Sequence, residues 1–133
     1  MKNIVRPLLA ALALSAPVTA AIAVPQDANA RLEKALRGRE PGEPVNCIPL
    51  RQASSSEIID GTAILYRVGD TIYVNRPRGG AESLRRADVL VTRTFDTRLC
   101  RPDIVTLVDR ASRFQRGFVS LGDFVPYRRA ETR

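Results

Sequence analysis

The chain of 133 residues carries 21 lysines and arginines against 14 aspartates and glutamates, for a formal net charge of +7, and it has no histidine. This length suits one domain around one hydrophobic core and is too short for two comfortable domains. The lack of histidine excludes Ser-His-Asp and Cys-His nucleophiles, histidine-based metal sites and the commonest general base. The arginines are spread along the whole chain without interleaved stacking aromatics, so the charge does not predict a nucleic-acid binder.

Residues 1–23 have the organisation of a secretory signal peptide, with a basic start, an apolar run from Leu8 to Ala16 and a small-residue exit. We expect cleavage after Ala23, with Ala20 and Ala30 as competing sites. A membrane anchor is the alternative, but the apolar stretch is interrupted and falls short of the ~20 residues that a span needs. The mature protein is therefore expected to be periplasmic or secreted, without a stable membrane span.

Residues 24–45 are rich in proline, glycine, alanine and charge, which is typical of a flexible segment. A short helix is expected over residues 31–37, with Leu32 and Leu36 on a narrow apolar face. Such a basic helix can lie on a membrane surface, but the small apolar face favours a solvated, partly frayed segment. Residues 39–44 predict a linker, because their two prolines cannot continue the helix.

Cys47 and Cys100 are the two cysteines of the chain. An even number in an exported protein predicts one disulfide, which would close a long loop around most of the domain. On the chain-entropy model such a cross-link is worth roughly 4 kcal/mol. A redox-active pair is the alternative, and it is disfavoured because cysteines of the thioredoxin kind lie two residues apart.

Residues 55–76 predict a three-stranded β-meander around which the rest of the domain is organised. Asp60-Gly61 and Gly69-Asp70 separate three strand-like runs. Each pair suits a tight hairpin turn, because such turns need residues that accept a positive φ.

The length of these two turns decides which side chains share a face of the meander. With two residues in each loop, Ile59 lies opposite Thr62 and Val68 lies opposite Thr71. One face then carries Ile58, Ala63, Leu65, Ile72 and Val74, and the other carries Ile59, Ile64, Tyr66, Val68 and Tyr73. The first face is the more uniformly aliphatic, so it is the predicted core face.

The second half of the chain predicts further strands joined by polar loops. Residues 77–87 form a surface loop with a Gly-Gly pair, and no phosphate-loop pattern completes there. Strands are expected over residues 88–94 and 103–109, and the second is apolar on both faces and therefore central. Residues 118–126 predict one or two short final strands.

These elements together predict a mainly β fold. A single domain over residues 46–127 would contain a small antiparallel meander that forms a partly open barrel or sandwich, preceded by the short N-terminal helix. Residues 128–133 are expected to be a loose tail.

Four short segments carry a resemblance to known proteins. They are Cys47-Ile48-Pro49-Leu50-Arg51, Ile72-Tyr73-Val74-Asn75-Arg76, Leu99-Cys100 and Leu121-Gly122-Asp123-Phe124-Val125-Pro126-Tyr127. Together they resemble a family of small exported proteobacterial proteins, a domain of unknown function. Its members have two further cysteines where this chain has Arg78-Gly79-Gly80 and Arg116-Gly117, and this departure supports a bond between Cys47 and Cys100 here. The resemblance implies no activity, cofactor or catalytic residue.

Carboxylates are the remaining candidates for catalysis or metal binding. The aspartates are isolated in the sequence and mostly sit at predicted turns, where aspartate has a backbone role; they are Asp60, Asp70, Asp88, Asp96, Asp103, Asp109 and Asp123. A carboxylate-based hydrolase stays open as an alternative, since two of them can meet in space. We expect no metal, no cofactor and no enzymatic activity.

The sequence favours a non-catalytic binding or envelope-accessory module whose ligand and partner stay open. One alternative is a binder of anionic envelope lipid or glycolipid. Its cations would be Arg110, Arg113 and Arg116, which recur at a fixed interval beside Phe114 and Phe118, together with Arg85 and Arg86. An ordinary solvated loop is the competing interpretation of this segment.

Overall fold

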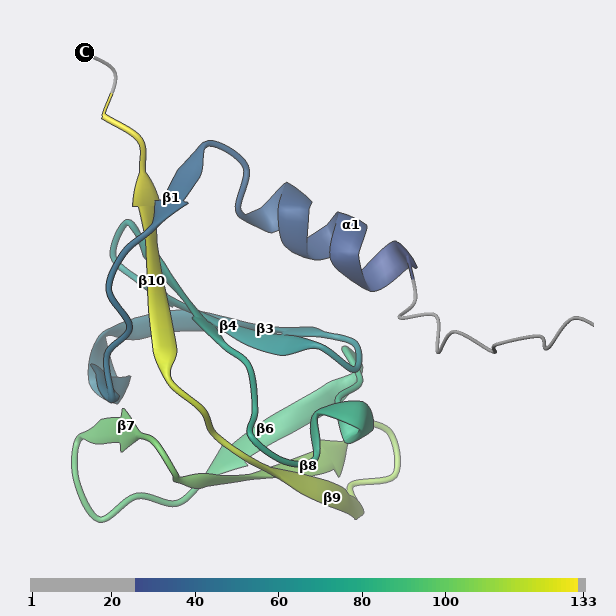
Figure 1. The fold of residues 1–133 in the computed structure, drawn as a ribbon. Helices are drawn as coiled ribbons and strands as arrows, with labels where there is room; N and C mark the ends of the chain where they lie inside the picture. Colours follow the sequence, from purple (N-terminus) through teal and green to yellow (C-terminus); the bar gives the residue numbers. More distant parts are fainter. Residues whose placement is uncertain (1–25, 132–133) are drawn as a thin grey trace, which may run out of the picture.

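A computed structural model describes residues 26–131, so the predicted signal peptide over residues 1–23 lies outside the described part of the chain (Figure 1). The helices are α1 (Gln26–Ala35) and the 3-10 turns η1 (Leu50–Gln52) and η2 (Ala81–Ser83). The strands are β1 (Arg39–Pro41), β2 (Cys47–Pro49), β3 (Ala53–Ile59), β4 (Ala63–Val68), β5 (Thr71–Asn75), β6 (Asp88–Thr92), β7 (Arg98–Cys100), β8 (Ile104–Asp109), β9 (Gln115–Ser120) and β10 (Phe124–Arg129).

The strands form three antiparallel sheets. The largest has five strands in the order β1-β10-β5-β4-β3, a second has three in the order β6-β8-β9, and β2 pairs with β7 alone. The core lies between the first two sheets, where Ile64, Tyr66 and Phe124 of one and Leu107 and Val119 of the other are buried in one cluster. The sheets stay open, so the predicted mainly β fold of sandwich or partly open barrel type is confirmed.

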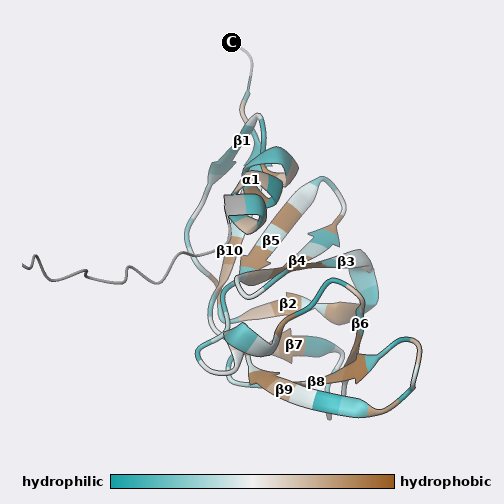
Figure 2. Cartoon of the chain, turned by 90° about the vertical axis from the view of Figure 1, so that its right-hand side faces the viewer, coloured by the Kyte–Doolittle hydropathy of each residue, from teal (hydrophilic) through white to brown (hydrophobic). Residues whose placement is uncertain are grey.

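Helix α1 covers the outer face of the five-stranded sheet (Figure 2). Ala28 and Leu32 are buried in a second apolar cluster with Leu65, Ile72 and Val74 of the sheet. Full burial of a leucine contributes about 1.5–3 kcal/mol, so the sheet supplies the stabilisation that a short helix lacks in isolation. The observed helix therefore differs from the predicted one over residues 31–37: it begins at Gln26, and its apolar face is packed rather than solvated.

Two segments that the sequence predicts as irregular pair with each other instead. Strand β1 lies within the predicted linker over residues 39–44, and β10 continues past residue 127 into the predicted loose tail. Glu40 lies opposite Arg128, and Arg39 lies opposite Arg129. Each segment gives the other the backbone hydrogen-bond partners that it lacks alone.

The first hairpin of the meander differs from its predicted register by one residue. Ile59 lies opposite Ala63, not opposite Thr62, and residues 60–62 form the loop. The Thr62 N–H donates to the Ile59 carbonyl at 3.0 Å, and Gly61 has a φ of +61°, as a turn at Asp60-Gly61 requires. The turn is thus where the sequence predicts it, but the loop is longer.

This one-residue shift exchanges two isoleucines between the faces of the sheet, because side chains alternate along a strand. Ile58 joins the core between the sheets, and Ile59 lies under α1. The second hairpin has the predicted register, with Val68 opposite Thr71. Both faces of the meander are buried. The aliphatic face, which the sequence predicts as the core face, lies beneath α1, and the opposite face forms the core between the two sheets.

In the three-stranded sheet β8 is central, as its apolar character on both faces predicts. In the two-stranded sheet Cys47 lies directly opposite Cys100, and the predicted disulfide joins them. Ile48 and Leu99, the neighbouring pair of this sheet, are buried in the main core. Residues 26–131 contain no helix that is long and apolar enough to cross a membrane.

Candidate functional site

The predicted anion-binding arginines do not form one cluster. Arg116 turns toward β6, where its Nε and Nη2 donate to the two carboxylate oxygens of Asp88 at 3.0 and 2.5 Å. Nη2 also donates to the Ser83 carbonyl at 3.3 Å. The hydrogen bonds to the buried Asp88 raise the pKa of Arg116, and they hold its guanidinium in an internal ion pair.

Arg110 and Arg113 lie in the turn between β8 and β9, and both are exposed. This turn is held by Asp109, whose Oδ1 accepts hydrogen bonds from the backbone of Ser112 at 2.7 Å and of Ala111 at 3.0 Å. The hydrogen bonds from Ser112 lower the pKa of Asp109. The two arginines are therefore presented to solvent by an ordered turn.

Arg85 and Arg86 lie in the loop before β6. The Arg86 N–H donates to Oδ1 of Asp60 at 2.6 Å, which ties this loop to the first turn of the meander. The Arg86 and Arg110 side chains line one cavity of about 360 Å³ beside β3 and β6, together with Arg31. Two of the five predicted residues thus meet, and Arg116 is paired with Asp88 instead.

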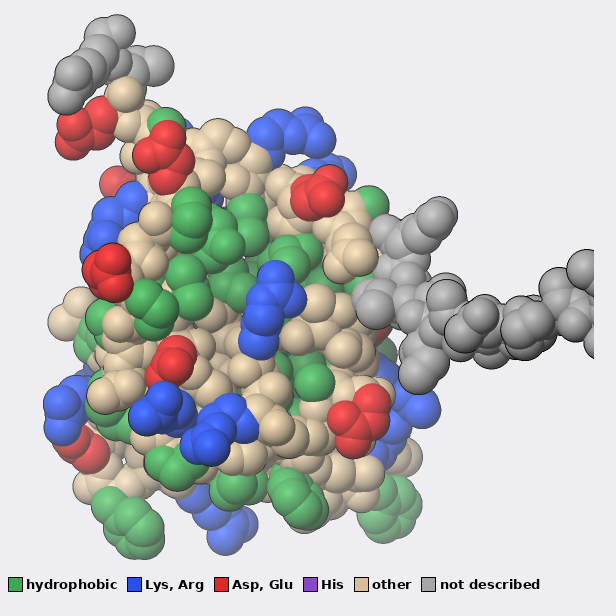
Figure 3. Space-filling view, in the orientation of Figure 1, with side chains coloured by type: hydrophobic (Ala, Val, Ile, Leu, Met, Phe, Trp, Pro, Cys, Tyr) green, Lys and Arg blue, Asp and Glu red, His purple; other side chains and the backbone are tan. Residues whose placement is uncertain are grey.

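A different group of arginines lines a larger hollow on the outer face of the five-stranded sheet. Its volume is about 460 Å³, and we call it the arginine hollow. It is lined by Pro44, Val74, Arg76, Arg78, Arg101, Gly122, Asp123, Val125 and Tyr127. Figure 3 shows this side of the molecule, where hydrophobic side chains gather between α1 and β10 with lysine and arginine side chains among and below them.

Strands β5 and β10 build the floor of the arginine hollow. Val74 and Val125 lie directly opposite each other in these strands and so share the outer face. Tyr127 lies on the same face two residues further along β10. Arg76 follows the end of β5, so its guanidinium stands beside this apolar floor.

Asn75 fixes the wall formed by Gly122 and Asp123. Its side chain is buried on the inner face of β5, where Nδ2 donates to the Gly122 carbonyl at 2.8 Å and Oδ1 accepts from the Gly122 N–H at 3.0 Å. A Cβ at Gly122 would lie only 2.4 Å from the carbonyl oxygen of Arg76. The two chain segments can approach this closely only because residue 122 has no side chain.

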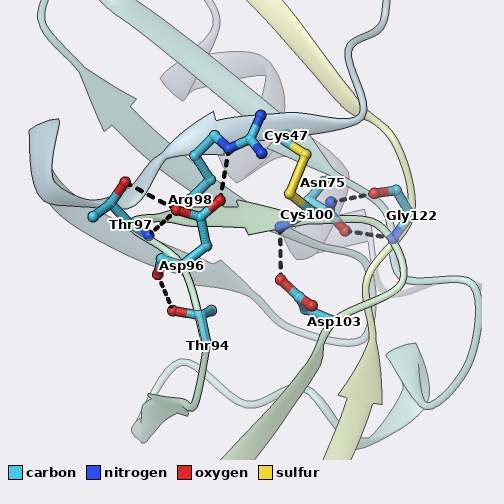
Figure 4. The surroundings of a disulfide bond; sticks show 9 residues. All are labelled: Cys47, Asn75, Thr94, Asp96, Thr97, Arg98, Cys100, Asp103 and Gly122. Atoms are coloured by element: carbon cyan, nitrogen blue, oxygen red, sulfur yellow. Dashed lines mark hydrogen bonds and ion pairs between the residues drawn. A yellow bond between two sulfur atoms is a disulfide. The ribbon is translucent and has the colours of Figure 1, made fainter.

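The disulfide positions the opposite wall. Arg101 directly follows Cys100, and its N–H donates to the carbonyl of Asn46, the residue before Cys47, at 2.8 Å. The Cys100 N–H donates to Oδ2 of Asp103 at 2.7 Å. Figure 4 shows the disulfide beside the Asn75 and Gly122 pair, so both constraints act at the same end of the sandwich.

The charge of the arginine hollow is strongly positive. Its lining contains three arginines and one carboxylate, that of Asp123. Arg101 Nη1 donates to Asp123 Oδ1 at 2.8 Å. That pair is about two-fifths exposed on each side, and such pairs contribute ~0–1 kcal/mol. Arg76 and Arg78 form no ion pair within residues 26–131.

A second cavity of about 400 Å³ adjoins the arginine hollow and extends it to the helix. The two share Arg76 and Tyr127, and the second is otherwise lined by residues of α1 and the turn after it: Asn29, Leu32, Glu33 and Leu36. A ligand larger than a single ion therefore has room to lie along β10 toward α1.

Within the described residues, no three histidine, cysteine, aspartate or glutamate side chains are grouped as a metal ion would require. Comparison of the chain with protein-family models, with curated proteins and with solved structures found no match. The resemblance to small exported proteobacterial proteins stays a prediction, and the candidate site rests on its geometry.

Proposed function

We propose that this chain is an exported binding module that holds an oxyanion, a phosphate or carboxylate group of a small ligand, in the arginine hollow. The observation that carries the proposal is the convergence of Arg76, Arg78 and Arg101 on one hollow that contains a single carboxylate, Asp123. Export is supported by the leader-like residues 1–23 and by the disulfide, since such bonds persist in oxidising compartments.

Guanidinium groups suit this role because their planar N–H donors match the oxygens of phosphate and carboxylate in bidentate pairs. Arg76 and Arg78 form no ion pair with another described residue, so a ligand anion would be their direct charge partner. The apolar floor of Val74 and Val125 and the ring of Tyr127 would contact a less polar body that carries the anion.

Binding fits the lining of the arginine hollow better than catalysis. Arginine side chains stay protonated at neutral pH, so they attract anions but do not act as general acids or bases. Asp123 is held by Arg101 in an ion pair. The chemistry that these residues offer is therefore recognition of charge and shape.

Isothermal titration calorimetry at low ionic strength tests the proposal with inorganic phosphate and citrate as probes. The variant Arg76→Gln/Arg78→Gln keeps side chains of similar polarity and removes two positive charges. Loss of two charge-assisted hydrogen bonds should weaken binding by about tenfold or more. Comparison of the two probes distinguishes a phosphate site from a carboxylate site.

The matched control is Arg51→Gln/Arg85→Gln, which removes the same charge at two exposed positions outside the hollow lining. It should bind both probes as the unmodified protein does. Equal weakening by the two double variants would show that net charge alone attracts the anions. The arginine hollow would then not be the site.

A further inference from the structure

The outer face of the three-stranded sheet is apolar and exposed. Val91 of β6, Thr106 of β8 and Phe118 of β9 lie in one row across the sheet, so their side chains share this face. Phe118 is 60% exposed, and Ile104, which lies two residues before Thr106 in β8, is 50% exposed. Residues 26–131 place no element over this face, whereas α1 covers the outer face of the other sheet.

Two further phenylalanines are exposed in loops at the two ends of this sheet. Phe114 lies in the turn after β8 and is 75% exposed, and Phe95 lies in the loop after β6 and is fully exposed. Because β6 and β8 are antiparallel, these two connections lie at opposite ends of the sheet. Hydrophobic side chains project along the lower edge of Figure 3, where Figure 1 places this sheet. We call the surface formed by Val89, Val91, Phe95, Ile104, Phe114 and Phe118 the phenylalanine face.

Arginines accompany the phenylalanines at both ends. Arg110 and Arg113 precede Phe114 in its turn, and Arg93 lies two residues before Phe95; all three arginines are exposed and form no ion pair with another described residue. The nearby acids have local partners instead. Asp96 pairs with Arg98 at 3.1 Å and accepts from the Thr97 N–H at 2.6 Å, and Asp109 accepts from the backbone of its own turn.

We propose that the phenylalanine face docks on the surface of an anionic phospholipid bilayer. Its exposed aromatic and aliphatic side chains enter the interfacial region, where apolar surface leaves water. Its arginines lie at the level of the head groups, and each basic residue near an anionic surface strengthens binding. Exposed apolar area and unpaired positive charge on one face are the two attractions that a peripheral membrane protein combines.

A second copy of this chain is a poorer occupant of the same face. Both ends of the phenylalanine face carry unpaired arginines. Any two-fold arrangement of two such faces would bring cations against cations, which is unfavourable. An anionic bilayer supplies the opposite charge at both ends at once.

This inference is independent of the arginine hollow. The inner faces of the two sheets form one core, so their outer faces point to opposite sides of the sandwich. A molecule docked through the phenylalanine face would hold the arginine hollow away from the bilayer and open to solvent.

Co-sedimentation with large unilamellar vesicles tests the docking. The full mature protein should bind vesicles of equimolar phosphatidylglycerol and phosphatidylcholine, and binding should weaken as salt shortens the Debye length below ~10 Å. Phe114→Ser/Phe118→Ser should bind about tenfold more weakly or worse. Arg110→Gln/Arg113→Gln should lose about fivefold per arginine. All four positions are exposed, so the melting temperature should stay unchanged.

Two controls separate this face from general charge effects and from the hollow. Arg37→Gln/Arg128→Gln, at exposed positions near α1 and in β10, and Arg76→Gln/Arg78→Gln should both bind vesicles much as the unmodified protein does. Binding that is equal for the unmodified protein and the Phe114→Ser/Phe118→Ser variant would overturn the inference. Failure of the unmodified protein to sediment with anionic vesicles would also overturn the inference. If light scattering then detects a dimer that Phe114→Ser/Phe118→Ser abolishes, the phenylalanine face is an interface between two copies of this chain instead.

Discussion

Asn75 binds the backbone of Gly122 through both atoms of its side-chain amide, although 47 positions separate the two residues in the chain. The pair joins the end of β5 to the segment that enters β10. The same two segments carry Arg76 and Asp123 into the arginine hollow. A buried side chain on the inner face of the sheet thus determines the geometry of a site on its outer face.

Replacing Asn75 by alanine should therefore destabilise the fold and disorder the hollow together. The buried N–H and carbonyl of Gly122 would lose their partners, at a cost of about 2–4 kcal/mol. Urea denaturation measures this loss. Asn46→Ala, at an exposed asparagine beside Cys47, is the control and should stay within about 0.5 kcal/mol. Equal stability of the two variants would mean that the amide pair contributes nothing.

The disulfide should carry a large share of the stability of this small domain. It closes a loop with a sequence separation of 53, and the chain-entropy model assigns roughly 4 kcal/mol to such a cross-link. Cys47→Ser/Cys100→Ser should lower the free energy of unfolding by about that amount. A reducing agent should destabilise the unmodified protein similarly and leave the double variant unaffected. A variant as stable as the oxidised protein would contradict this.

Two glycines should respond differently to alanine substitution. At Gly61 the φ of +61° makes a side chain unfavourable, but no atom lies within 4 Å of the added Cβ, so the cost is the backbone term of about 1–2 kcal/mol. At Gly122 the Cβ would lie 2.4 Å from the Arg76 carbonyl oxygen, and the backbone must shift. Thermal denaturation should therefore rank Gly122→Ala as the less stable variant. The reverse order would refute the close approach of the two segments.

Tyr66 should make the protein sensitive to alkaline pH. Burial raises the pKa of Tyr66 above its ordinary value of about 10, and its hydroxyl finds no hydrogen-bond partner among the described residues. A raised folded-state pKa leaves stability intact below the unfolded value. Stability is then lost as pH rises past about 10, because only the unfolded chain readily releases the proton.

The variant Tyr66→Phe removes both the buried hydroxyl and this titration. It should be more stable than the unmodified protein at pH 7 by about 1 kcal/mol, since no hydrogen bond is lost and the desolvation cost disappears. Its free energy of unfolding should also fall less steeply between pH 9 and 11. Parallel pH profiles for the two proteins would argue against a buried, ionisable Tyr66.

The sequence predicts the fold well where local chemistry decides the structure. The turns at Asp60-Gly61 and Gly69-Asp70, the central strand β8 and the disulfide follow from residue type, from the pattern of apolar and polar residues along a strand and from the even number of cysteines. The register of the first hairpin does not follow from the sequence, because a two-residue loop and a three-residue loop share the same Asp60-Gly61 turn signal. The burial of α1 depends on a sheet whose outer face is built by residues far along the chain.

The arginine hollow depends even more on long-range structure. Arg76 and Arg78 follow β5 in one loop, whereas Arg101 follows β7, and these distant segments meet beside the pair of Asn75 with Gly122 and the bond between Cys47 and Cys100. A regular interval in sequence, which singles out Arg110, Arg113 and Arg116, takes no account of the internal pairing of Arg116 with Asp88. The available sequence signal is that Arg76 ends one segment of the family resemblance and Arg101 directly follows another.

Titration of the isotopically labelled protein with phosphate, followed in two-dimensional amide spectra, tests the central claim most directly. The account predicts that signals of Arg76, Arg78, Gly122 and Asp123 shift along one saturable curve, because these residues line the hollow that would hold the anion. Signals of the turn from Arg110 to Phe114 should stay in place. Shifts confined to that turn, or a linear response of all basic segments without saturation, would contradict an oxyanion site in the arginine hollow.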